Sequence, residues 1–177
     1  KGIFAGNDYF NVFSYTLIQG DKNLVLTDKQ GIVISERLAI KLFNTTENVI
    51  GKALEWDHKM NLKGRFRITG VFENIPSNST SQFDLIFNYK NLFEVDSYAT
   101  DWRGAYAETF LVLKKGTNAD HFNKKIANFS KSKDPANEKC TLFIQQFSRK
   151  YLYGRYENGV HSLTRLLSVS RVSFCII

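Results

Sequence analysis

Few residues in this chain have the type and spacing that chemistry requires. Ser130 and Lys133 match the SxxK motif, in which serine is the nucleophile and lysine assists it. That motif needs its serine at the start of a helix, together with KTG and SxN motifs. Here the serine falls at the end of a predicted helix and the companion motifs are missing. We therefore expect no acyl-transfer site at this position.

Three acidic residues, Asp84, Asp101 and Glu108, could meet in space as a general acid and base, but their spacing does not favour such a pair. The sequence contains no GxGxxG, GxSxG or HExxH motif. Gly51-Lys52 lacks the upstream glycine of a phosphate-binding loop. The sequence thus predicts neither a catalytic residue nor a cofactor site, and we expect that the protein is not an enzyme.

The histidines and cysteines are too widely spaced for a metal site. None of His58, His121 and His161 has a second His or Cys three to five residues away. The two cysteines, Cys140 and Cys175, form no CxxC pair, which excludes a zinc ribbon and a disulfide scaffold. We expect surface or structural roles for the histidines and no bound metal. Two cysteines suit either a reducing compartment or a periplasmic domain without disulfides.

Composition indicates an ordinary globular chain with a basic balance. Its 177 residues, 43% hydrophobic and 23% charged, are enough for one domain or two small lobes. The net charge is +7, but lysine and arginine occur in short groups beside apolar segments. This scatter is typical of solvated faces, and we expect no nucleic-acid partner. No apolar run reaches the 18 residues that a membrane helix needs.

The first half of the chain predicts a mostly β lobe. A β-branched strand at 31–34 leads directly into Ser35, a good N-cap, and a helix that ends at Asn44. Further strands are expected at 53–56, 65–72 and 83–87. Gly70 inside the second of these predicts a bulge or a close backbone approach.

The second half predicts a strand, a helix and a strand. Residues 109–113 form an unbroken apolar run, as in a strand buried on both faces. An apolar stripe at 119, 122, 126 and 129 predicts one helix, and 141–147 predicts the next strand. Together they form a βαβ or split βαβ unit. The expected fold class is α+β, with a mostly β lobe over 1–105, a βαβ lobe over 106–150 and a C-terminal segment over 151–177.

Aromatic side chains are the remaining candidates for a binding surface. We expect a partner-contact surface on an exposed part of the β lobe around Trp56 and Phe66. Tyr151 and Tyr153 stand among basic residues, so they could form a membrane-interface belt, a partner surface or part of the core. The apolar end of the chain, 172–177, fits equally the first turns of a membrane helix and a terminal strand.

The order of several weak motifs resembles the extracytoplasmic domain of MacB/FtsX-type ABC transporter permeases, especially the long two-domain permeases of Bacteroidetes-type bacteria. The motifs run over about residues 1 to 160. They are Asp8-Tyr9-Phe10-Asn11-Val12-Phe13, Leu17-Ile18-Gln19-Gly20-Asp21, Val33-Ile34-Ser35-Glu36-Arg37-Leu38-Ala39, Ile50-Gly51-Lys52, Ile68-Thr69-Gly70-Val71-Phe72, Pro76-Ser77-Asn78-Ser79 with Phe83-Asp84, Thr109 to Gly116, and Leu152-Tyr153-Gly154. Asn48-Val49 stands where the family usually has Asp-Pro, and residues 163–177 follow the pattern poorly, either by divergence or because they are not native.

The resemblance implies a MacB-type periplasmic core domain, anchored in the bacterial inner membrane and facing the periplasm. Such a domain transmits ATP-driven conformational change for the export of peptides, lipoproteins or drug-like substrates. Its implied partners are a cytoplasmic ATPase subunit, reached through the full-length permease, a second permease copy or half, and an exported substrate or periplasmic protein. The alternative is a stand-alone periplasmic or cell-surface α+β binding module.

Overall fold

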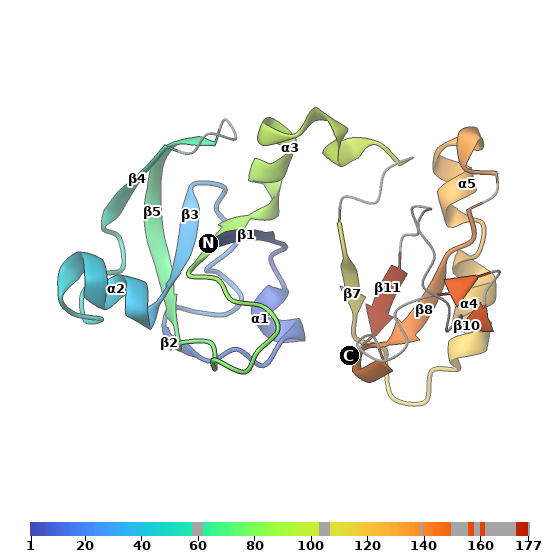
Figure 1. The fold of residues 1–177 in the computed structure, drawn as a ribbon, viewed down its shortest axis with the longest axis horizontal. Helices are drawn as coiled ribbons and strands as arrows, with labels where there is room; N and C mark the ends of the chain where they lie inside the picture. The colour runs from blue at the N-terminus through green and yellow to red at the C-terminus, as the bar shows by residue number, and fades with distance from the viewer. Residues whose placement is uncertain are drawn as a thin grey trace. The chain divides into compact units, whose positions relative to one another are not determined.

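The computed structural model describes residues 1–57, 62–102, 107–138, 140–149, 156–157, 160–161 and 173–176. The chain divides into two compact units, Lys1–Ser97 (unit 1) and Tyr98–Ile177 (unit 2), which are drawn in Figure 1. Strands and helices occur in both units, which confirms the predicted α+β class. None of the helices in the described ranges is both long and apolar enough to cross a membrane.

Unit 1 is built on a six-stranded mixed sheet. Its strands are β1 (Gly2–Ala5), β2 (Leu17–Gln19), β3 (Gly31–Ser35), β4 (Ala53–Asp57), β5 (Lys63–Phe72) and β6 (Leu85–Asn88). Their order is β1-β6-β3-β5-β2, and β4 also pairs with β5. The helices of this unit are α1 (Tyr9–Val12), α2 (Glu36–Phe43) and α3 (Leu92–Val95), and 3-10 turns at Tyr89–Asn91 and Ser97–Thr100 flank α3.

Both faces of this sheet are covered, which explains why β3 is apolar without interruption. Ile32 and Ile34 point into the core beneath α2, whereas Val33 points into a second core that contains Phe10 of α1. Figure 1 shows α2 and α1 on opposite sides of β3 and β5. A strand covered on both faces needs apolar residues at every position rather than at alternate ones.

Helix α2 begins and ends where the sequence predicts. The Ser35 side chain accepts a hydrogen bond from the backbone N–H of Leu38, and Asn44 takes the left-handed conformation with φ 57°. Ser35 thus satisfies one of the N–H groups that a helix leaves unpaired in its first turn, and Asn44 supplies the left-handed residue that ends the helix. The predicted N-cap and C-terminal stop are therefore confirmed.

The predicted irregularity at Gly70 is a bulge in β5. Ile32 pairs with Ile68, but Val33 pairs with Gly70, so Thr69 is the extra residue. The Thr69 hydroxyl lies 2.6 Å from the carbonyl oxygen of Val25 and 3.2 Å from that of Ile32. A Cβ atom on Gly70 would lie 2.9 Å from Cγ1 of Val25, so only glycine fits without rearrangement.

Unit 2 contains a three-stranded parallel sheet of order β7-β11-β8, formed by β7 (Thr109–Leu111), β8 (Phe143–Gln146) and β11 (Ser173–Ile176). Helices α4 (Ala119–Ile126) and α5 (Phe129–Lys133) lie between β7 and β8 in the chain, with 3-10 turns at Pro135–Asn137 and Phe147–Arg149. Short strands β9 (Tyr156–Glu157) and β10 (Val160–His161) form a separate pair. Because β11 separates β7 from β8, the arrangement is a split βαβ. The apolar end of the chain thus forms a strand.

Two local predictions for unit 2 are wrong. The run 109–113 is only partly buried, and Val112, which follows β7, is 61% exposed, so this segment is not a strand buried on both faces. The single helix predicted over 119–129 is broken into α4 and α5. At this break the carbonyl of Ala127 accepts a hydrogen bond from the N–H of Leu142, which ties the turn to the segment before β8.

Candidate functional site

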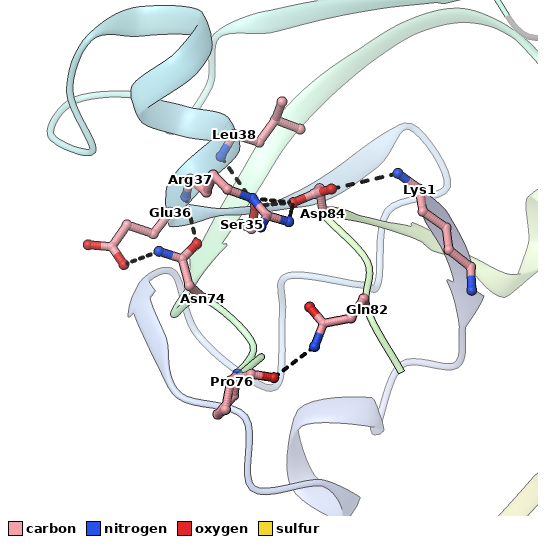
Figure 2. Close-up of polar contacts among 9 residues, drawn as sticks. All are labelled: Lys1, Ser35, Glu36, Arg37, Leu38, Asn74, Pro76, Gln82 and Asp84. Carbon is pink, nitrogen blue, oxygen red and sulfur yellow. Dashed lines mark hydrogen bonds and ion pairs between the residues drawn. The ribbon is translucent and has the colours of Figure 1, made fainter. Parts of the chain in front are cut away.

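Asp84 lies where three parts of unit 1 meet: the segment before β6, the end of β3 and the start of α2. Its backbone N–H donates to the carbonyl of Lys1 at 2.8 Å, and its carbonyl accepts from the N–H of Ser35 at the same distance. The backbone of Asp84 is therefore held on both sides. This placement leaves its carboxylate at the N-terminus of α2 (Figure 2).

The carboxylate of Asp84 collects the polar groups around it. The Ser35 hydroxyl donates to Oδ1 at 3.1 Å, and Arg37 donates to the same oxygen from Nε at 3.2 Å and from Nη2 at 2.5 Å. The α-amino nitrogen of Lys1 lies 3.6 Å from Oδ2. Figure 2 shows these groups converging on Asp84.

Asn74 supplies a second cap for the same helix. Its side-chain oxygen accepts from the backbone N–H of Arg37 at 2.8 Å, and its amide donates to the carboxylate of Glu36 at 2.9 Å. Ser35 and Asn74 thus satisfy two of the first N–H groups of α2, although 39 positions separate them in the chain. Between Asn74 and Asp84 the chain makes a turn, in which the side-chain amide of Gln82 donates to the carbonyl of Pro76 at 2.7 Å.

The electrostatics of this cluster keep Asp84 ionised. Burial is the largest single influence and by itself raises the pKa of Asp84, whose side chain is 24% exposed. The hydrogen bonds from Arg37 and Ser35, with the charge of Arg37, outweigh it and lower the pKa below its usual value of 3.8.

The geometry of the Asp84 cluster favours a structural role, in which hydrogen bonds and an ion pair join segments of unit 1, over a catalytic one. A carboxylate with a lowered pKa is a weak base, so Asp84 is poorly suited to remove the proton of the Ser35 hydroxyl. That hydroxyl is also occupied on both sides, since it accepts from Leu38 and donates to Asp84. The arrangement ties α2 and the 74–84 segment to the sheet.

Replacing Asp84 with asparagine is expected to lower the free energy of unfolding of unit 1 by about 2 kcal/mol at neutral pH, since charge-assisted bonds to Arg37 are lost. Because the folded-state pKa is lowered, the stabilisation is complete above the unfolded pKa of about 3.9 and is lost as pH falls through the folded value. The difference between wild type and Asp84→Asn should therefore shrink below about pH 4. Urea unfolding at neutral pH and near pH 3 measures both effects.

Asp57→Asn is the matched control for this experiment. Asp57 pairs with Lys63, but their side chains are 73% and 65% exposed, so the pair should contribute less than about 0.5 kcal/mol. Equal effects of the two substitutions would show that the Asp84 cluster does not hold unit 1 together.

Of the residues predicted for partner contact, Trp56 and Phe66 contribute to the core of unit 1. Phe66 is only 4% exposed, and its ring lies 5.0 Å from that of Phe87. Trp56 is partly buried, with its ring 5.4 Å from Phe87. The prediction of an exposed surface at Phe66 is wrong, because β5 directs this ring into the core. Tyr151 and Tyr153 lie outside the described residues.

The SxxK pair does not assemble a nucleophile and its base. The sequence predicted Ser130 at the end of a helix, and this is wrong. Because the helix is interrupted before Phe129, Ser130 is the second residue of α5. Its hydroxyl is buried and without a hydrogen-bond partner. Lys133 is directed elsewhere, with its ammonium 5.2 Å from the centre of the Phe129 ring. Asp84, the third candidate acid, is bound by Arg37 in unit 1, whereas Asp101 and Glu108 belong to unit 2.

Sequence reasoning missed Asn74 and the partnership of Asp84 with Arg37. Both acceptors flank the Pro76-Ser77-Asn78-Ser79 turn, and both reach the first turn of α2. The signal that could have found them is the helix itself: Ser35 caps only one of its N-terminal N–H groups, so a second acceptor had to come from elsewhere.

This fold, a mixed sheet covered on both faces and followed by a split βαβ unit, is that of a periplasmic core domain. The chain belongs to the MacB-like periplasmic core domain family, whose sequence model matches residues 1–129. The resemblance seen in the motifs is thereby confirmed. No curated protein sequence matches this chain.

A solved structure shows the same fold. It is the crystal structure of a domain of a protein described as a permease, from Porphyromonas gingivalis, with 22% sequence identity and a TM-score of 0.52. The match covers 75% of this chain and 58% of that one. The present chain thus spans a little over half of the length of that structure.

Proposed function

We propose that this chain is the extracytoplasmic part of an ABC transporter permease in the bacterial inner membrane. It transmits ATP-driven movement from the membrane to the periplasm and supports the export of peptide, lipoprotein or drug-like substrates. It catalyses no reaction itself. Its partners are a cytoplasmic ATPase, reached through the membrane helices of the permease, and a second permease copy or half.

The observation that carries this proposal is that the family motifs converge on the Asp84 cluster. Ser35 and Arg37 come from one motif and Asp84 from another, 47 positions beyond Arg37, and they meet at one carboxylate. A part that transmits force must move as one body, since a helix that slips on its sheet would absorb the movement. The cluster supplies that rigidity.

The full reading frame and its products test the proposal. The proposal requires membrane helices in the same polypeptide and co-purification of an ATPase with it. A reading frame that encodes only a cleavable signal peptide and this domain would contradict the proposal. It would leave the alternative, a stand-alone periplasmic or cell-surface binding module.

A further inference from the structure

The net positive charge of the chain lies in unit 2. Residues 1–97 contain 11 Lys and Arg and 11 Asp and Glu, which gives a net charge of zero. Residues 98–177 contain 13 Lys and Arg and 6 Asp and Glu, and so carry the whole charge of +7. An asymmetry of this kind between two parts of one chain points to an anionic partner for the basic part.

The charge is exposed along α4 and α5. No Asp or Glu occurs from His121 to Lys133. Phe122 and Ile126 are half-buried and Ser130 is buried, so these residues turn inward. Four lysines of this segment are exposed: Lys124, Lys125, Lys131 and Lys133. Asp120 and Asp134 flank this segment, and the side chain of Asp134 caps the following 3-10 turn at Ala136.

Two exposed aromatic residues lie among these charges. Trp102 is 42% exposed and Phe129 is 43% exposed, and their ring centroids are 5.6 Å apart in an edge-on arrangement. The ammonium of Lys133 lies above the Phe129 ring. We call the four lysines, together with Trp102 and Phe129, the basic face.

We propose that the basic face docks on the headgroup layer of an anionic lipid bilayer. The amphipathic indole ring of Trp102 is of the kind that prefers that layer, and lysine reaches lipid phosphates with a long apolar stem beneath its charge. All the cations of residues 107–138 are lysine, not arginine. Arginine supplies the bidentate contacts that favour specific recognition of nucleic acid. The inference goes beyond the proposed transmission of movement and does not depend on it.

Sedimentation with lipid vesicles tests the docking. The full 177-residue chain should bind vesicles that contain about 30% phosphatidylglycerol in phosphatidylcholine, and should be released by about 0.5 M NaCl. Replacing Lys124, Lys125, Lys131 and Lys133 with glutamine should weaken the partition coefficient at least about tenfold. The matched control replaces four exposed lysines of unit 1, Lys22, Lys41, Lys63 and Lys90, with glutamine and should bind as the wild type does.

A second readout reports which face meets the lipid. In a Trp56→Phe background the emission of Trp102 should shift to shorter wavelength on the anionic vesicles and be quenched by brominated lipid. Equal binding by the two four-lysine variants, or no quenching of Trp102, would overturn the proposal. Binding to a DNA duplex without binding to vesicles would also overturn it, in favour of a nucleic-acid partner.

Discussion

Phe87→Ala is expected to lower the free energy of unfolding of unit 1 by about 4 kcal/mol. Phe87 is 2% exposed and lies in β6, between two neighbouring strands. Its ring contacts those of Phe4, Trp56 and Phe66 at centroid distances of 5.8, 5.4 and 5.0 Å. Removing the ring leaves a cavity that these neighbours, fixed on three different strands, cannot collapse to fill.

Urea unfolding of the Trp102→Phe chain measures this effect, because the remaining tryptophan, Trp56, contacts Phe87 and reports unit 1. Phe93→Ala is the matched control. That ring is 43% exposed and contacts only Tyr89 among the ring pairs of the described residues, so its loss should change stability by less than about 1 kcal/mol. A small effect of Phe87→Ala would show that the core is loosely packed and that unit 1 is not a rigid body.

Gly20→Ala should cost about 3 kcal/mol, from two sources. Gly20 has a φ of 102°, a conformation that non-glycine residues adopt only with strain of about 1 kcal/mol. A Cβ atom there would also lie 2.6 Å from Cγ1 of Val25 and 2.8 Å from the carbonyl oxygen of Thr69. The second contact is with the backbone at the β5 bulge, so turning a side chain cannot relieve the clash. The clash should cost a further amount of about 1–3 kcal/mol.

Gly51→Ala separates the two sources. Gly51 also has a positive φ, 84°, but a Cβ atom on it would meet nothing within 4 Å. It should therefore show the conformational strain alone, about 1 kcal/mol. The same urea titration compares both variants, and equal losses at Gly20 and Gly51 would mean that the loop after β2 does not press on the bulge.

Local patterns predicted the centre of unit 1 well. The turn from β3 into α2 follows from Ser35 and Asn44, because caps act within a few residues of the helix they serve. The bulge at Gly70 followed from the same kind of signal, a glycine inside a strand. Each of these features depends on the chemistry of neighbouring residues, so the sequence alone is sufficient.

The failures share a different physical origin. The side of β5 to which Phe66 points depends on its register with β4, and the exposure of 109–113 depends on what packs against the faces of that segment. The break between α4 and α5 lies where the N–H of Leu142, 15 residues further along the chain, bonds to the carbonyl of Ala127. All three involve contacts between segments distant in the sequence, and periodicity within one segment does not report such contacts.

For the same reason, only part of the candidate site could be predicted from the sequence. Ser35 could be assigned as a cap from its own position, whereas the roles of Asn74 and Asp84 exist only once the chain returns to the start of α2. The family resemblance placed these motifs in the right order. It did not show that they meet at one carboxylate.

The two units differ in charge, packing and proposed role. Unit 1 has balanced charge, a core on each face of its sheet and a polar cluster that locks α2 in place. Unit 2 has the excess positive charge and the exposed pair Trp102 and Phe129. A stiff body and a basic, membrane-facing part suit a domain that receives movement from a membrane and passes it on.

Distances between spin labels in the assembled permease test the central claim of transmission most directly. Cys140 and Cys175 are first replaced by serine. A single label at Lys41→Cys in each permease copy then reports the distance between the domains of the two copies. A pair of labels at Lys41→Cys and Lys90→Cys reports the rigidity of one domain. Trapping the ATPase in its ATP-bound state should change the first distance and leave the second unchanged. A distance between copies that does not respond to ATP would contradict the account.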